Sequence, residues 1–242
     1  MKKVIACLMC ILLVVVSVSV GFRLGSNEKE NEGTVVQASV VVAKKIINVP
    51  TISRFPDLPT GCEAVSATMV LQYYGVDITA EDFVLSWLEC SDDFHRENGR
   101  LYGPDPNKVF AGNPFVVNSY GCFAEPIINA INHNSYDCKA QKISNGILSE
   151  LCYEYIDNDK PLLIWATMNM EDSYEGNSWY LEDGTKFTWI AREHCLVLVG
   201  YNDAYYLLND PMTGNVVAYR KDVVEKRFAE LGGQAIYVSK NE

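Results

Sequence analysis

Cys62 combines a reactive side chain with a position that favours nucleophilic chemistry. It follows a Pro-Thr-Gly turn inside the strongest helical pattern of the chain, Leu58–Gly75. Thr60 and Glu63 have the T-x-x-E spacing of a capping box, so we expect Thr60 to cap this helix and Cys62 to occupy its second position. Unpaired N–H groups and the helix dipole favour an anion there, which predicts a lowered thiol pKa and a nucleophilic thiolate. The competing interpretation is a small buried core thiol.

A histidine and an acid downstream could complete a nucleophilic site. His194 begins an apolar strand-like run and lies 132 residues after Cys62, within the roughly 130–150 residues typical of papain-type enzymes. Asp210 ends the next predicted strand, in Leu-Asn-Asp-Pro. A short hairpin would bring it beside His194, where its carboxylate could accept from the imidazole Nδ1–H. Asn209 is the alternative third member, and an ordinary turn aspartate before proline is the competing interpretation of Asp210.

The elements around these residues predict an α+β fold, with helices first and an antiparallel sheet later. The Cys62 helix is apolar almost all round, which places it in the middle of the domain. A second capping box, from Thr79 to Asp82, predicts another helix through about residue 88. We expect further helices at 125–133, 147–157 and 221–231, strands at 161–168, 194–201, 205–209 and 234–239, and loops at 89–122 and 169–189.

The N-terminus has the layout of an export signal. Two lysines precede an almost entirely apolar run over Val4–Phe22, as in a secretory signal, and the run is long enough to anchor a chain in a membrane. We interpret residues 1–25 as a signal peptide or membrane anchor, and residues 26–47 as a linker or stalk whose valine-rich part could add an edge strand. Residues 48–242 would form the compact domain, extracellular or at the cell surface, contacting a membrane only through an uncleaved anchor.

Charge excludes one class of partner. The chain carries 20 basic and 31 acidic residues, a net charge of −11. Without residues 1–25 the balance is 17 basic to 31 acidic, or −14. A surface that negative repels nucleic acid, so we expect no nucleic-acid partner.

The cysteines and histidines predict neither a metal site nor a cofactor. Residues 26–242 contain no C-x-x-C pair, and the three histidines, His95, His133 and His194, are far apart, so no zinc site is expected. The remaining cysteines are spaced widely and irregularly, unlike a small disulfide scaffold, and their pairing is left open: Cys90, Cys122, Cys138, Cys152 and Cys195.

Four segments together resemble a known family. They are TGCEAVSATMVLQYYG, WATMNM, EHCLVLVGYND and YYLLNDP, and they are similar to exported cysteine peptidase-like proteins related to the bacteriocin-leader (double-glycine) peptidases. The resemblance covers residues 49–238. It implies a papain-like fold, whose central helix carries the nucleophile and packs on an antiparallel sheet. It further implies a Cys62–His194–Asp210 triad that acts on a peptide or protein substrate without a cofactor.

One departure from the family pattern concerns the oxyanion donor. Relatives usually carry a glutamine a few residues before the nucleophile, but residues 51–61 contain no Gln or Asn, and Arg54 occupies that region. Losing one such donor typically costs ~10²–10³ in rate. We expect an exported cysteine peptidase that forms an acyl-enzyme, with Arg54 as a candidate oxyanion donor. Two alternatives stay open: acyl transfer through the same thioester, and a weak or inactive surface binding module.

Overall fold

The computed structural model describes residues 36–37 and 43–241. All of them belong to one unit, residues 31–242. The expected export segment, residues 1–25, and most of the expected linker lie outside the described residues. Within the described ranges, no helix has both the length and the apolar character needed to cross a bilayer.

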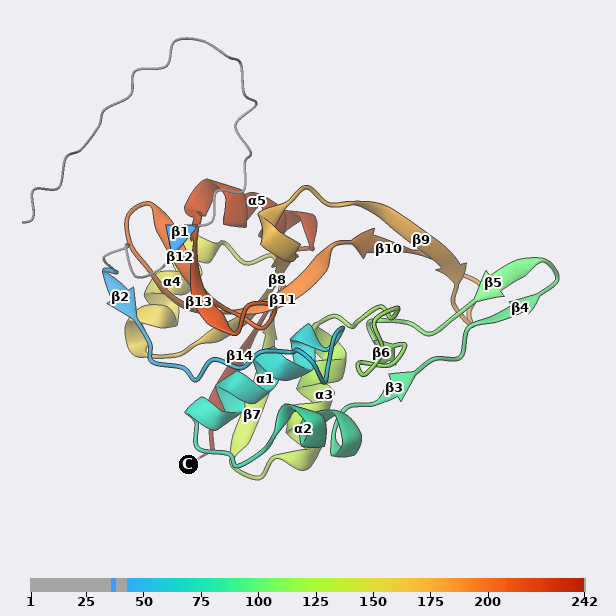
Figure 1. Cartoon of the computed structure of the whole chain (residues 1–242), viewed down its shortest axis with the longest axis horizontal. Coiled ribbons are helices and arrows are strands. Elements are labelled where there is room, and N and C mark those ends of the chain that lie inside the picture. Colours follow the sequence, from blue (N-terminus) through green and yellow to red (C-terminus); the bar gives the residue numbers. More distant parts are fainter. Residues whose placement is uncertain (1–35, 38–42, 242) are drawn as a thin grey trace, which may run out of the picture. The chain divides into compact units, whose positions relative to one another are not determined.

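An antiparallel sheet forms the centre of the fold (Figure 1). Its order is β1-β13-β12-β11-β8-β14-β7, and β2 also pairs with β11. Every residue of β8 and β11 is buried, as expected of strands covered on both faces. The bounds are β1 Val36–Gln37, β2 Lys45–Ile46, β7 Cys138–Ile143, β8 Leu162–Thr167, β11 Glu193–Tyr201, β12 Tyr205–Asp210, β13 Asn215–Arg220 and β14 Ala235–Lys240.

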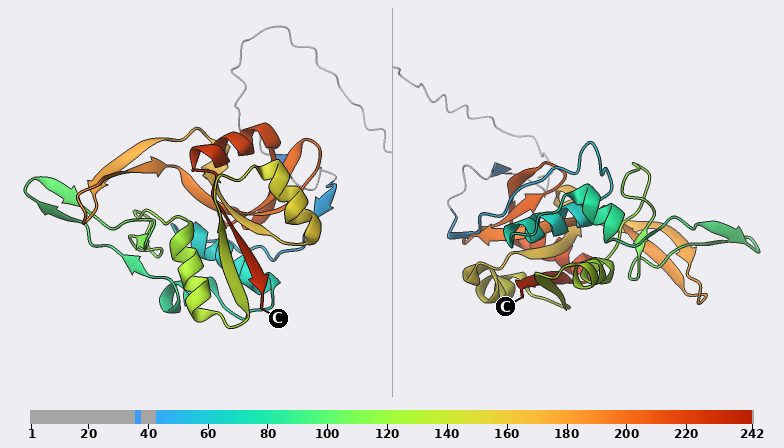
Figure 2. Two further views of the ribbon diagram at one scale, coloured as in Figure 1. Left: turned by 180° about the vertical axis from the view of Figure 1, so that it is seen from behind. Right: turned by 90° about the horizontal axis from the view of Figure 1, so that it is seen from below.

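Helices cover both sides of the central strands. Helix α1, Cys62–Tyr73, packs against β11 and β8 and is buried from Cys62 to Leu71. Helix α5, Lys221–Glu230, contacts β8 and β13 from the opposite side (Figures 1 and 2). The others are α2 Ala80–Ser86, α3 Ala124–Asn134 and α4 Leu148–Glu154, with 3-10 turns at Ile156–Asn158 and Met168–Met170. The predicted α+β fold, with a central helix packed on an antiparallel sheet, is confirmed.

The two predicted capping boxes have different outcomes. Thr79 caps α2 by accepting the Asp82 N–H at 3.0 Å, as predicted. The box proposed for α1 is wrong. That helix begins at Cys62, after Gly61, without a side-chain cap, and the Thr60 hydroxyl instead contacts the Val116 carbonyl at 3.0 Å. Cys62 is therefore the first helical residue rather than the second.

The predicted loops at 89–122 and 169–189 contain short strands. Strands β9, Tyr174–Tyr180, and β10, Lys186–Ala191, form a hairpin that joins β5, Arg100–Tyr102, and β4, His95–Glu97. We call these four strands the β-arm, because they extend away from the central sheet (Figure 1). Nearby, β3, Cys90–Ser91, pairs in parallel with β6, Phe110–Ala111. Ring contacts of 4.8–5.3 Å between centroids join Trp179 to Phe94, Tyr120 and Phe187.

Candidate active site

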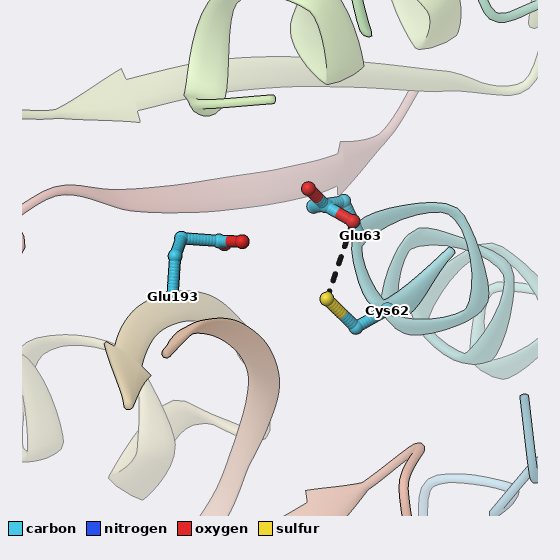
Figure 3. Close-up of side chains that lie close together, drawn as sticks. All are labelled: Cys62, Glu63 and Glu193. Atoms are coloured by element: carbon cyan, nitrogen blue, oxygen red, sulfur yellow. Dashed lines mark hydrogen bonds between the residues drawn. The ribbon is translucent and has the colours of Figure 1, made fainter. Parts of the chain in front are cut away.

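The structure places Cys62 at the buried start of the central helix. Cys62 is 3% exposed. Its Sγ donates a hydrogen bond to Glu63 Oε2 at 3.2 Å (Figure 3). Burial, followed by the charges of Glu63 and Glu193, raises the thiol pKa well above its ordinary value, and Arg54 opposes that shift. The prediction of a lowered pKa is therefore wrong for this structure, because desolvation and two carboxylates outweigh the helix N-terminus.

His194 and Asp210 form a fully buried pair on adjacent strands. His194 Nε2 lies 2.7 Å from Asp210 Oδ1, and both side chains are 0% exposed. Burial disfavours the ionised acid, but the hydrogen bond and charge of His194 outweigh it, so the pKa of Asp210 lies below its ordinary value. The contact uses Nε2, where we expected Nδ1. A second acceptor bond, from the Met212 N–H to Oδ1 at 2.8 Å, holds the carboxylate in place.

This pairing leaves the other imidazole nitrogen available. Because an ionised Asp210 only accepts hydrogen bonds, Nε2 carries the proton and a neutral His194 has its lone pair on Nδ1. Nδ1 is buried, and it has no hydrogen-bond partner in the described part of the chain. Over the same residues no hydrogen bond joins Cys62 to His194. Catalytic hydrogen bonds are often long or poorly aligned before substrate binds.

Asn209 has a different environment from Asp210. Its Nδ2 donates to the carbonyls of Val49 and Pro50, each at 3.1 Å. The residue is 1% exposed, and its amide ties β12 to the chain segment that leads toward α1. The structure thus brings Asp210, and not Asn209, to His194.

Arg54 is a buried cation near the candidate site. It is 9% exposed, and its main-chain N–H donates to the Pro211 carbonyl at 2.8 Å. The guanidinium contacts Met168 Sδ at 4.0 Å, while its Nε is buried with no partner among the described residues. Its charge opposes the rise in the pKa of three acids, Cys62, Glu63 and Glu193, and adds to the lowering of the Asp210 pKa.

Two buried glutamates lie beside the thiol, and the sequence reasoning missed their role. Glu63 is 0% exposed and its Oε1 accepts the Cys122 N–H at 2.6 Å. Burial raises the pKa of Glu63 to about 7. Glu193 is 7% exposed, with Oε1 buried and unpartnered within the described residues. Burial, and then Glu63, raise its pKa well above the ordinary value.

The glutamates and the thiol converge on one point. One carboxylate oxygen from each and the Cys62 sulfur lie within 4.8 Å of one another (Figure 3). A sequence signal did exist, because Glu63 follows the candidate nucleophile directly and Glu193 precedes the candidate base. The T-x-x-E spacing assigns Glu63 to the helix cap instead, and Glu63 and Glu193 lie too far apart in the sequence for a local pattern to pair them.

No disulfide forms among the described cysteines. Cys62, Cys90, Cys122, Cys138, Cys152 and Cys195 are all free thiols in the structure. Cys90 is the exposed member of this set.

A central helix that begins at a cysteine and packs on an antiparallel sheet is the arrangement of the papain-like fold. Residues 46–236 match the sequence model of the Peptidase_C39 like family, and the chain belongs to that family. The family resemblance inferred from the four segments is confirmed.

Two relatives illustrate the match. The uncharacterised protein YvpB of Bacillus subtilis (strain 168) is 28% identical over 186 residues, which cover 76% of this chain and 71% of YvpB. The crystal structure of a C39-like peptidase from Bacillus anthracis has a TM-score of 0.71 and 25% identity, over 82% of this chain and 99% of that one. The second comparison supports the same fold over nearly the whole described domain.

Proposed function

We propose that the protein is a cysteine peptidase that hydrolyses peptide bonds through Cys62, His194 and Asp210. The observation that carries the proposal is the buried 2.7 Å contact between His194 Nε2 and Asp210, which leaves Nδ1 unpartnered within the described chain. A base oriented by an acid in this way is the arrangement that activates a cysteine nucleophile. Membership of the Peptidase_C39 like family supports the same reaction class.

The reaction proceeds in two stages. His194 Nδ1 takes the thiol proton as Cys62 Sγ attacks the substrate carbonyl carbon. The C–N bond then breaks, the same nitrogen protonates the leaving amine, and a thioester remains on Cys62. Water then attacks the thioester carbonyl, and Nδ1 removes a proton from this water. The resulting tetrahedral intermediate collapses, with the proton returned to sulfur, which releases the carboxylic acid and restores the thiol.

Activation requires the thiol to change partner. In the structure its proton points to Glu63, and burial disfavours the thiolate. A substrate that enters the site and turns Sγ from Glu63 toward His194 would form the reactive pair only in the complex. The thiolate would then be generated during attack instead of being stored in the free enzyme.

Two donors are available for the oxyanion. The Cys62 main-chain N–H belongs to the first turn of α1, where N–H groups have no intrahelical partner. Arg54 adds a buried guanidinium whose Nε has no partner among the described residues. In our proposal Arg54 takes the place of the glutamine that the resemblance led us to expect.

The test compares three full-length variants on a peptide mixture that includes double-glycine leader sequences. Cys62→Ala and His194→Ala should abolish cleavage, while Cys90→Ala, which removes an exposed thiol, should cleave as the wild type does. Mass spectrometry of the products identifies the bond broken. Cleavage that survives in Cys62→Ala would contradict the proposal. An added amine acceptor separates hydrolysis from acyl transfer, because transfer yields an amine adduct instead of the free acid.

A non-catalytic binding module is the second candidate. The buried, protonated Cys62 thiol favours it, because such a thiol reacts slowly. The discriminating result is a tightly bound peptide that is never cleaved and whose affinity is unchanged in Cys62→Ala.

We also propose that residues 1–25 export the chain, on the strength of their basic start and apolar run. Fractionation of cells, with and without these residues, tests this. Protein that stays inside cells in both cases would contradict it.

A further inference from the structure

We propose that Cys62, Glu63 and Glu193 form a binding site for a zinc ion, which holds the nucleophile in an inactive state. Binding stands on the geometry of the three side chains alone. The inhibitory consequence rests on the proposed peptidase function.

The ligand geometry comes first. The three donor atoms lie within 4.8 Å of one another, and Cys62 Sγ is already 3.2 Å from Glu63 Oε2. Zinc binds thiolate at about 2.3 Å and carboxylate oxygen at about 2.0–2.2 Å in tetrahedral geometry, which separates neighbouring ligand atoms by roughly 3.3–3.6 Å. Small side-chain adjustments would therefore bring all three donors onto one ion, with a fourth position left for water.

An unsatisfied buried oxygen points independently to a ligand. Glu193 is 7% exposed, and its Oε1 is buried without a hydrogen-bond partner among the described residues. Figure 3 shows its carboxyl group directed toward Cys62 and Glu63. Leaving a buried carboxylate oxygen unpaired is costly, and a cation at the centre of the three donors would satisfy it.

Charge and donor type select the ion. A thiolate and two carboxylates carry three negative charges, and Arg54 is the cation whose charge acts on all three. His194 and Asp210 pair with each other. Arg54 offsets one of the three negative charges, and a divalent ion would neutralise the remaining two. The sulfur donor favours zinc over magnesium or calcium, which prefer oxygen ligands.

The consequence follows from the sulfur lone pair. A zinc–sulfur bond uses the electron pair with which Cys62 would attack a carbonyl, and it removes the proton that His194 would accept. The reaction would be blocked reversibly, and a chelator would restore it.

The experiment titrates zinc chloride into the chelator-stripped full-length chain and measures binding by calorimetry. The wild type should bind one ion at this site. Glu193→Gln should weaken binding by at least about 10–100-fold, the loss typical when a residue that only supports a metal ligand is mutated. Glu175→Gln, on an exposed part of β9, should not weaken it. With cadmium as probe, the thiolate-to-metal absorbance band should be lost in Cys62→Ser and kept in Cys90→Ser.

Thermal unfolding without metal shows whether Glu193→Gln is folded. If Glu193→Gln does not fold, the presence or loss of the cadmium band in Cys62→Ser tests the site instead. Absence of stoichiometric zinc binding, or binding unchanged in Cys62→Ser, would overturn the inference. Zinc bound with the expected pattern to a chain that cleaves no peptide would leave the site in place and remove the proposed function. Peptide cleavage by a chain that binds no zinc at this site would keep the proposed function and overturn the zinc site.

Discussion

His194 Nε2 lies 2.7 Å from Asp210 Oδ1, with both side chains fully buried. The pair joins the beginning of β11 to the end of β12. A charged acceptor on Nε2 fixes the imidazole tautomer and directs the Nδ1 lone pair away from the aspartate. This one contact sets both the orientation and the tautomer of the proposed base.

Asp210→Asn should therefore lower kcat sharply while leaving the fold intact. An amide can present its NH₂ group to Nε2 and select the wrong tautomer, a change that costs up to about 10⁴ in the serine-protease case. Steady-state kinetics on the cleaved peptide measure the loss. Asn209→Ala is the matched comparison, because Asn209 contacts the Val49 and Pro50 carbonyls and should affect stability more than kcat. Equal losses of kcat in both variants would argue against Asp210 as the orienting acid.

Glu63 should make the fold less stable as the pH rises from acid to neutral. Its pKa is about 7 in the native state against an ordinary 4.5. The native state therefore keeps a proton that the unfolded chain releases between these values, and linkage lowers the free energy of unfolding over that window. The loss is on the order of 3 kcal/mol for a shift of this size. Below the ordinary pKa both states are protonated, and the cost disappears.

Urea unfolding with a chelator present, at several pH values across that window, measures the effect. Glu63→Gln resembles the protonated acid, so its stability should change less with pH than that of the wild type. Glu175→Gln, an exposed carboxylate, should keep the wild-type slope. Parallel slopes for wild type and Glu63→Gln would show that Glu63 does not hold the proton.

Local sequence signals predicted the elements that depend on local interactions. Thr79 and Asp82 lie three residues apart, and their capping contact needs no distant partner. The long apolar runs that became β8 and β11, together with helix α3, were predicted to within a few residues of their observed bounds. Cys62, His194 and Asp210 were predicted to form one site because residue type, spacing and strand order all indicated it, and the structure brings His194 and Asp210 together.

Long-range contacts explain the failures. Glu63 does not reach back to Thr60, because its carboxylate accepts from Cys122, which is 59 residues away. The β-arm strands mix polar and aromatic residues, and ring contacts between separate segments hold them together, as between Tyr120 and Trp179. Such tertiary contacts override local propensity, and no window of sequence contains them.

Arg54→Ala should reduce kcat more than it changes KM. If Arg54 donates to the oxyanion, the interaction exists mainly in the transition state, and its loss should cost ~10²–10³ in rate. Arg54→Gln keeps a donor without the charge and should recover part of that loss. Arg100→Ala is the control, because Arg100 lies on the β-arm, with its guanidinium 4.9 Å from the Tyr180 ring. A purely structural Arg54 would show an unchanged kcat once the variant is folded.

Gly121→Ala should destabilise the fold through Glu63. A side chain at Gly121 would collide with the Glu63 carboxylate and come within 3.1 Å of Glu193 Oε2. A flexible carboxylate could normally move aside, but Glu63 is buried and accepts from both Cys62 and Cys122. Moving it breaks these hydrogen bonds, so we expect a loss of about 1–3 kcal/mol, typical of overpacking.

A double-mutant cycle tests the cause of that loss. In a Glu63→Ala background the collision with the Glu63 carboxylate is absent, so adding Gly121→Ala should cost less than it does in the wild type. The difference should exceed about 0.5 kcal/mol, the margin within which changes at independent sites add. Denaturant unfolding of the four proteins gives the coupling energy directly. If Gly121→Ala costs as much in the Glu63→Ala background as in the wild type, the glycine is required for some other contact, and Gly121 does not serve to make room for the buried acid beside the nucleophile.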